Sequence, residues 1–158
     1  MLNFLFCFTY LTAIGITSQI IGVRLPRDAF KPEKFPYRLY AFEKNGLIYE
    51  KIGIKYWKNR VPDMSRHSKK MVPKTLPPHA TAAQAQALVM ETCVAEIVHW
   101  LLIVFAVPCF FIWRGPGGAV VFALYAIGNL VFIIIQRYNR PRQAALAAAL
   151  RKKESGVR

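Results

Sequence analysis

Three long apolar stretches alternate with polar stretches along this chain of 158 residues. They cover residues 2–23, residues 80–113 and residues 118–136, and the most apolar part of the second begins at Val94. A bilayer core takes about 20 apolar residues in a helix, so each stretch is long enough to span a membrane. Glycine and proline at 114–118 make a short turn that joins antiparallel neighbours. The pattern therefore predicts an all-α integral membrane protein with three transmembrane helices.

The first polar stretch is expected to carry an interfacial amphipathic helix. Asn45 is a suitable N-terminal cap for a helix that runs to about Arg60. On this helix Ile48, Ile52 and Tyr56 share one face, and lysines occupy the others. Such a helix is typical of segments that lie in the plane of the membrane interface.

The remaining polar segments complete one predicted membrane domain, residues 1–158. Residues 24–79 form a basic and aromatic loop, in which 64–78 is a flexible or gating loop because of its serines and prolines. Thr81 can cap a long helix that continues through the second span. Residues 142–153 predict a separate C-terminal surface helix ending in cations, which suits the helix dipole.

Charge is segregated in the same way as hydropathy. Residues 24–79 carry 14 Lys and Arg against 5 Asp and Glu, a net of +9, and residues 136–158 carry +6, within a total of +14. By the positive-inside rule both stretches are cytoplasmic, which predicts a multi-pass protein of the cell (inner) membrane. The alternative is two spans with a re-entrant first segment. A cleaved signal peptide is disfavoured because no basic residue precedes the first apolar run.

Composition narrows the classes of function. A mean hydropathy of +0.26 with 54% hydrophobic residues excludes a disordered chain and disfavours a soluble nucleic-acid binder, so no nucleic-acid partner is predicted. The basic stretches favour contact with anionic membrane lipids. The three cysteines show neither a pairing pattern nor metal-ligand spacing, which argues against a disulfide scaffold.

One helix face of the second span carries polar side chains. Glu91, Thr92, Glu96 and His99 fall within an arc of about 140°, at about 100° per residue, and Glu96 and His99, three apart, can touch. Counted from Trp113, His99 lies about 21 Å along the helix, within the apolar core. Ionisable groups at that depth cost about 2.5–3.5 kcal/mol and usually face a protein interior or a wet cavity. The alternative is a structural cluster that ties helices together.

A second polar group ends the third span, with the sequence Gln136-Arg137-Tyr138-Asn139-Arg140-Pro141-Arg142. It offers more directional hydrogen-bond donors than a positive-inside anchor needs. Because the second and third spans are antiparallel, this group and the Glu/His face are expected to meet at the same cytoplasmic rim.

Together these groups predict acyl transfer from a cytosolic, phosphate-bearing donor to a hydroxyl on a lipid. His99 would be the general base, Glu96 would orient it, and Glu91 lies on the same face. Arginine and amide side chains such as Arg137 and Asn139 suit the oxyanion. No metal is predicted, because Glu96-x-x-His99 is only half of a di-iron motif. Cys93 is disfavoured as a nucleophile because it points away from His99.

At these residues the sequence resembles the glycosyl-4,4′-diaponeurosporenoate acyltransferase family of staphyloxanthin-type carotenoid biosynthesis. The resemblance covers roughly residues 20–145. The matching motifs are Arg24-Leu25-Pro26, Phe42-Glu43-Lys44-Asn45-Gly46, Tyr49-Glu50, Lys55-Tyr56-Trp57-Lys58, Glu91-Thr92, Ala95-Glu96, His99-Trp100 and Gln136 to Arg142.

The resemblance implies a membrane O-acyltransferase that esterifies a sugar hydroxyl of a glycosylated lipid or carotenoid. It adds substrate- or donor-binding residues to the site, namely Thr92, Gln136, Arg137, Asn139, Arg140 and, upstream, Glu43, Tyr49, Glu50 and Trp57. Acyl-CoA is the expected co-substrate, with Arg140 and loop lysines on its phosphates, and no cofactor is expected. A homo-oligomer, such as a dimer, would help three spans enclose a cavity.

Two other classes of function remain open from the sequence. The first is a non-catalytic membrane subunit that binds anionic lipids through its basic stretches. The second is another lipid-modifying membrane enzyme, such as a methyltransferase or a reductase, that uses the same rim.

Overall fold

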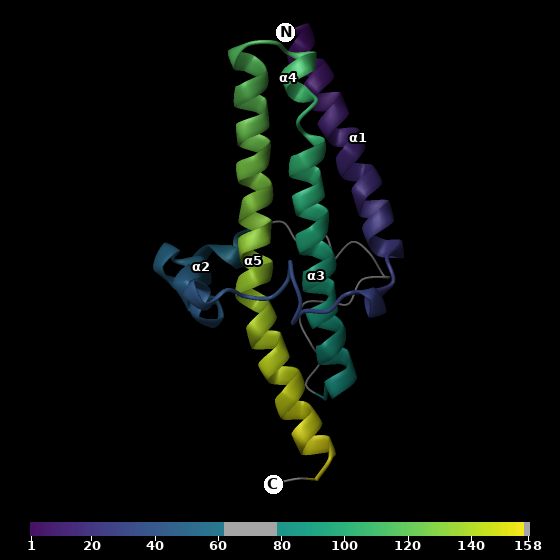
Figure 1. Ribbon diagram of the computed structural model, residues 1–158, viewed down its shortest axis with the longest axis vertical. Helices are drawn as coiled ribbons and strands as arrows, with labels where there is room; N and C mark the ends of the chain where they lie inside the picture. Colours follow the sequence, from purple (N-terminus) through teal and green to yellow (C-terminus); the bar gives the residue numbers. More distant parts are fainter. Residues whose placement is uncertain (62–78, 157–158) are drawn as a thin grey trace. The chain divides into compact units, whose positions relative to one another are not determined.

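The computed structural model describes residues 1–61 and 79–156, and within these ranges all regular structure is helical. The elements in chain order are α1 (Leu2–Arg24), η1 (Arg27–Ala29), η2 (Ala41–Ile52), α2 (Ile54–Trp57), η3 (Lys58–Arg60), α3 (Ala82–Phe105), α4 (Cys109–Ile112) and α5 (Pro116–Glu154) (Figure 1). The predicted loop at 64–78 lies outside the described residues.

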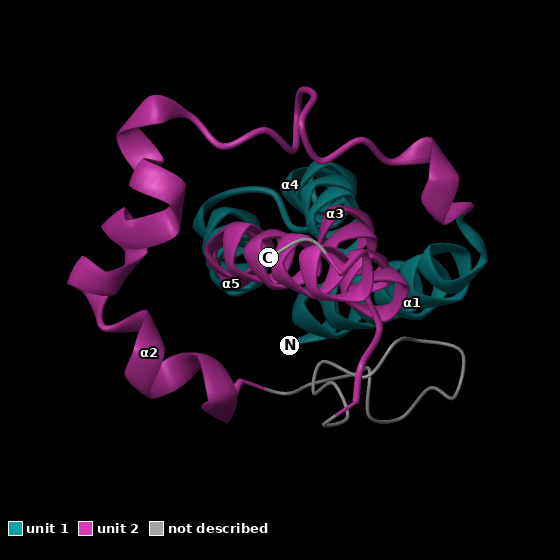
Figure 2. Ribbon diagram, turned by 90° about the horizontal axis from the view of Figure 1, so that it is seen from below, with its two compact units in different colours: residues 1–25, 95–133 teal, residues 26–94, 134–158 magenta. Residues whose placement is uncertain are grey.

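Three segments are helical, long and apolar enough to cross a membrane, namely Leu2–Arg24, Ala82–Ile112 and Pro116–Glu154. The prediction of an all-α membrane protein with three spans is therefore confirmed. The chain divides into two compact units (Figure 2). Unit 1 contains residues 1–25 and 95–133, and unit 2 contains residues 26–94 and 134–158. The prediction of one membrane domain stays a prediction.

Unit 1 is a bundle built from α1, the end of α3, α4 and the start of α5. The Tyr10 hydroxyl donates to the Phe105 carbonyl at 2.7 Å. A Cβ atom on Gly22 would lie 3.3 Å from Val98 Cγ2, so this glycine permits a close approach of the two helices. The sequence predicted a long helix over 80–113 that nothing breaks before Pro108, and α3 ends slightly earlier, at Phe105. The amides that follow shift to i−3 carbonyls, and Pro108 has no amide hydrogen to donate.

Unit 2 consists of the connecting segment, which we define as residues 26–60, together with residues 82–94 of α3 and residues 134–154 of α5. The connecting segment passes around these two helix ends, as the magenta trace in Figure 2 shows. Where α3 begins and α5 ends, the backbone amide of Ala82 donates to the Glu154 carboxylate at 2.8 Å. Thr81 caps α3 as predicted, since its hydroxyl accepts from the Gln84 amide while the Gln84 side chain accepts from the Thr81 amide.

The predicted amphipathic helix from Asn45 to Arg60 is wrong in its start and its continuity. Lys44, Asn45 and Gly46 adopt left-handed conformations, with φ values of 48°, 55° and 83°, so Asn45 lies in a turn inside η2. The physical reason is tertiary: a Cβ atom on Gly46 would lie 3.3 Å from the Tyr138 Cα of α5, so this turn packs directly on that helix. Short helical turns to Arg60 then replace the single helix.

The C-terminal helix is also continuous with the third span. Residues 142–153 are helical as predicted, but they belong to α5, which passes through Pro141 without a break. An internal proline removes one backbone hydrogen bond and usually kinks or ends a helix. Here Arg140 and Arg142, on either side of Pro141, are both bound by other residues of unit 2, which opposes a break at this point.

We predict that Gly46→Ala destabilises the protein, because a Cβ atom there would combine a positive φ with a close contact to α5. Left-handed non-glycine residues cost about 1–3 kcal/mol. Gly128→Ala is the matched control, since a Cβ there meets nothing within 4 Å and alanine favours helix over glycine by about 1 kcal/mol. Thermal unfolding in detergent should give a lower Tm for the first variant and an equal or higher Tm for the second. Equal Tm values for both variants would contradict the packing role of Gly46.

Candidate active site

The buried polar side chains of the described residues are almost all ones that the sequence singled out. Seven polar or charged residues are buried: Glu43, Thr92, Glu96, Asn129, Gln136, Arg137 and Arg140. Six of these seven were predicted site residues, and Asn129 is the addition. Burying such groups is costly unless they are hydrogen-bonded or paired. Their partners therefore show what each is positioned to do.

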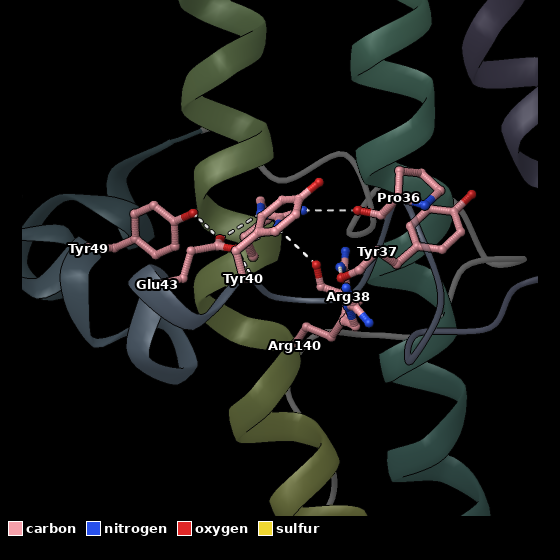
Figure 3. A network of polar contacts seen from close by, with 8 residues as sticks. Pro36, Tyr37, Arg38, Tyr40, Glu43, Tyr49 and Arg140 are labelled. Carbon is pink, nitrogen blue, oxygen red and sulfur yellow. Dashed lines mark hydrogen bonds and ion pairs between the residues drawn. The ribbon is translucent and has the colours of Figure 1, made fainter.

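Glu43 and Arg137 form a buried ion pair in unit 2. Figure 3 shows the Glu43 side chain between those of Tyr40 and Tyr49. Glu43 is 1% exposed. Arg137 donates from Nε to Glu43 Oε1 at 2.7 Å and from Nη2 to Glu43 Oε2 at 2.6 Å, the paired arrangement that suits a planar guanidinium. The Tyr49 hydroxyl and the Tyr40 backbone amide also donate to this carboxylate. Through Glu43, Arg137 of α5 thus holds the parts of the connecting segment around Tyr40 and Tyr49.

These contacts set the protonation of the cluster. Burial by itself raises the pKa of Glu43, but the hydrogen bonds from Arg137, Tyr49 and the Tyr40 amide, with the positive charge of Arg137, outweigh it and hold the pKa below its usual 4.5. Burial and the Glu43 carboxylate together raise the pKa of Tyr49 to about 12. Glu43 is therefore a carboxylate and Tyr49 a neutral hydrogen-bond donor at neutral pH.

Two arginines of α5 also bind consecutive backbone carbonyls of the connecting segment. Arg137 donates to the carbonyls of Pro36 and Arg38, both at 3.2 Å, and Arg140 donates to that of Tyr37 at 2.5 Å. Each guanidinium also lies over an aromatic ring, Arg140 at 5.6 Å from the Tyr37 centroid. Carbonyls in turns lack the partners that a helix or strand ladder provides, and here the arginines satisfy three of them.

Arg140 also binds α3. Its Nε donates to the Thr92 hydroxyl at 2.9 Å, and its Nη2 donates to the Thr92 carbonyl at 3.2 Å. The Thr92 hydroxyl in turn donates to the Val89 carbonyl at 2.7 Å. The prediction that residues 136–140 meet the polar face of the second span is thus confirmed for the pair of Arg140 and Thr92.

A second charged cluster lies further along α5. Arg142 donates to Glu50 at 2.7 Å and lies 3.6 Å from the centroid of the Tyr138 ring. Lys55 pairs with the same carboxylate at 2.8 Å. The hydrogen bond and charge of Lys55, followed by those of Arg142, lower the pKa of Glu50. This exposed cluster binds the second half of the connecting segment to the helix.

The other predicted residues of unit 2 have separate partners. Asn139 accepts a hydrogen bond from Lys58 Nζ at 3.2 Å. Trp57 donates its indole hydrogen to the Ile52 carbonyl at 2.9 Å, a contact within the connecting segment. Glu91 forms a paired ion bridge with Arg27, at 2.9 and 3.0 Å. Gln136 is buried on α5.

In unit 1, His99 is held by two residues of α5. Its Nδ1 lies 2.9 Å from Asn129 Oδ1, and its ring stacks on Phe132 with the centroids 4.7 Å apart and the planes 7° apart. Glu96, one turn earlier on α3, is 0% exposed. The sequence predicted Glu96 as the group that orients His99, and this stays a prediction, whereas the structure shows the contact of His99 with Asn129 directly.

The Asn129 amide determines which His99 nitrogen carries the proton. Asn129 Nδ2 donates to the Tyr125 carbonyl at 2.9 Å, so the amide oxygen is the atom that faces the imidazole. An amide oxygen accepts only, and His99 Nδ1 must therefore be protonated. In the neutral ring Nε2 then has the lone pair, which is the form that a general base requires.

Several functional contacts were not found from the sequence. Asn129 is an amide in the middle of an apolar stretch, and that isolated polarity was the signal available for it. Tyr40 and the carbonyls of residues 36–38 gave no signal, because backbone groups occur at every position. Arg27 gave no signal beyond its charge, although it pairs with Glu91.

The fold and these polar groups define a class: a helical membrane protein with a histidine–asparagine pair in one unit and a buried carboxylate–arginine cluster in the other. The model of the family described as glycosyl-4,4′-diaponeurosporenoate acyltransferase matches residues 27–149. The chain belongs to this family.

Curated relatives with that name agree over most of the chain. The proteins of Staphylococcus aureus strains Newman, bovine RF122 / ET3-1 and MRSA252 are 26%, 25% and 25% identical to it over 151 residues. Each match covers 94% of this chain and 90% of the relative. No solved structure matched the chain.

We predict that Glu43→Gln lowers stability strongly, because it leaves the buried Arg137 charge without its carboxylate, a loss of about 3–5 kcal/mol. Glu33→Gln, at an exposed position, is the control and should unfold like the unchanged protein.

The folded-state pKa of Glu43 is depressed, so its ionisation stabilises the fold above about pH 4.5, and this contribution is lost as the pH falls through the folded-state value. Thermal unfolding is measured from pH 7 downwards in steps of about one pH unit. The Tm of Glu43→Gln should depend less on pH than the Tm of the unchanged protein. Parallel curves for the two proteins would contradict this assignment.

Proposed function

We propose that this protein transfers a fatty acyl group from a phosphate-bearing thioester donor, acyl-CoA, to a sugar hydroxyl of a glycosylated lipid or carotenoid. The observation that carries the proposal is the His99–Asn129 pair, which orients the imidazole through its Nδ1 in a chain of this acyltransferase family. The name of the curated relatives, glycosyl-4,4′-diaponeurosporenoate acyltransferase, supplies the acceptor class, a glycosylated carotenoid. The active face is the cytoplasmic one, where the basic stretches lie by the positive-inside rule.

His99 is the proposed general base. Its Nε2 takes the proton of the acceptor hydroxyl as the oxygen attacks the thioester carbonyl carbon. The tetrahedral intermediate then collapses, the carbon–sulfur bond breaks, and the imidazolium returns the proton to the leaving thiolate. Asn129 accepts from Nδ1 throughout and stabilises the imidazolium, while Phe132 limits ring rotation.

The arginines of α5 have a positioning role in this proposal. Arg137 and Arg140 were expected to bind the donor, yet in this structure most of their hydrogens point at Glu43, Thr92 and backbone carbonyls. They order the connecting segment and its exposed cations.

We predict that His99→Ala abolishes most acyl transfer, with kcat reduced by about 10²–10⁴-fold, the contribution typical of a general base. His79→Ala removes an exposed histidine of the same chain and is the control. The measurement is the formation of acylated glycolipid from acyl-CoA in detergent-solubilised or reconstituted enzyme, followed by lipid mass spectrometry. Unchanged transfer by a folded His99→Ala protein would overturn the catalytic proposal and favour a non-catalytic lipid-binding subunit.

We predict that Asn129→Leu lowers kcat with little change in KM for the donor, because it frees His99 Nδ1 without removing the base. Asn129→Asp keeps an oxygen acceptor at the same position and should recover most of the lost rate. A purely structural role for Asn129 would instead lower the yield of folded protein and leave the activity per folded molecule unchanged for both variants.

A further inference from the structure

The connecting segment exposes many large apolar side chains. Tyr56 and Phe35 are 82% and 80% exposed, and Phe42 is 64% exposed. Leu47 and Ile52 are each 54% exposed. Exposed single apolar residues are ordinary, but this many within one short segment, three of them aromatic, mark a surface that contacts something apolar.

Lysines are interleaved with these residues. Lys31, Lys34, Lys44, Lys51 and Lys55 are all exposed and belong to the same segment. Aromatic rings beside long cationic side chains suit the headgroup layer of a bilayer, where the rings and methylene stems lie below the charges. A folded partner protein would bury an apolar centre with a polar rim, whereas here the two kinds of side chain alternate.

The attachment of the segment to α5 sets its level on that helix. It binds α5 through Arg137, Arg140 and Arg142. These arginines directly follow the apolar run that ends at Ile135, within about 11 Å of it at 1.5 Å per residue. At the other end, Pro26 follows α1, which ends at Arg24, after a single residue. Both attachments therefore lie where apolar helix gives way to polar sequence.

We propose that the connecting segment is a membrane-interface belt, with Phe35, Phe42 and Tyr56 inserted at headgroup depth and the lysines on anionic headgroups. The belt holds the carboxylate–arginine cluster at the level where a lipid-borne sugar meets the aqueous phase. The belt contacts the bilayer in which the protein itself lies. Contact with lipid requires no catalysis, so the belt does not depend on the proposed chemistry at His99.

Spin labels test this placement. Phe35→Cys, Phe42→Cys and Tyr56→Cys proteins are each labelled with a nitroxide and reconstituted in vesicles of phosphatidylcholine and phosphatidylglycerol. Ser155→Cys, exposed in the same unit, is the matched aqueous control. The three native cysteines are buried, and labelling of the unchanged chain measures their contribution. Collision with oxygen, which partitions into lipid, is compared with collision with a water-soluble nickel chelate.

The expected result is a several-fold higher ratio of oxygen to nickel accessibility at positions 35, 42 and 56 than at 155. Nickel accessibility equal to that of position 155 would place the segment in water and overturn the proposal. Low accessibility to both probes would mean that protein, such as a second copy of the chain, covers the segment, and would overturn it as well. Acyl transfer by the same labelled proteins is measured in parallel, so that a failed belt and a failed catalytic assignment are distinguished.

Discussion

The ion pair of Glu43 and Arg137 is the interaction on which unit 2 depends. It joins the connecting segment to α5 across 94 positions of sequence, with a carboxylate that is 1% exposed. Removing two charges from water is expensive, and the cost is offset only where geometry is good and every remaining lone pair and hydrogen is satisfied. Here the second partners of both groups, Tyr49, the Tyr40 amide and two backbone carbonyls, meet that condition.

The consequence is that a stretch of turns and short helices acquires a defined conformation without a sheet or a long helix. Its carbonyls are bound by guanidinium groups, and its turns are packed on α5 at Gly46. Arginine is suited to this because its planar fork donates in several directions at once and keeps its charge at any physiological pH. Lysine in place of Arg137 would have neither the paired geometry nor enough directed donors.

In unit 1, contacts with α5 set the orientation of the His99 imidazole. His99 is stacked on one α5 side chain and hydrogen-bonded by another, and the bond of Asn129 to the Tyr125 carbonyl fixes the direction of that amide. A pair of this kind defines the tautomer without a second charge inside the span, where ionised groups are costly. Asn129 therefore gives His99 an orienting contact that the sequence did not predict, and the orienting role of Glu96 stays a prediction.

The three helices follow from the sequence alone, because apolar runs of spanning length have few other stable structures in lipid. The sequence also identified most of the buried polar residues, because polar groups stand out within apolar stretches or within the matching family motifs. Only the tertiary structure decided the turn at Gly46, the unbroken passage of α5 through Pro141 and the partners of Arg137, Arg140 and Glu91. These features depend on contacts between residues about 50 to 100 positions apart, and local propensity and periodicity carry no information about such contacts.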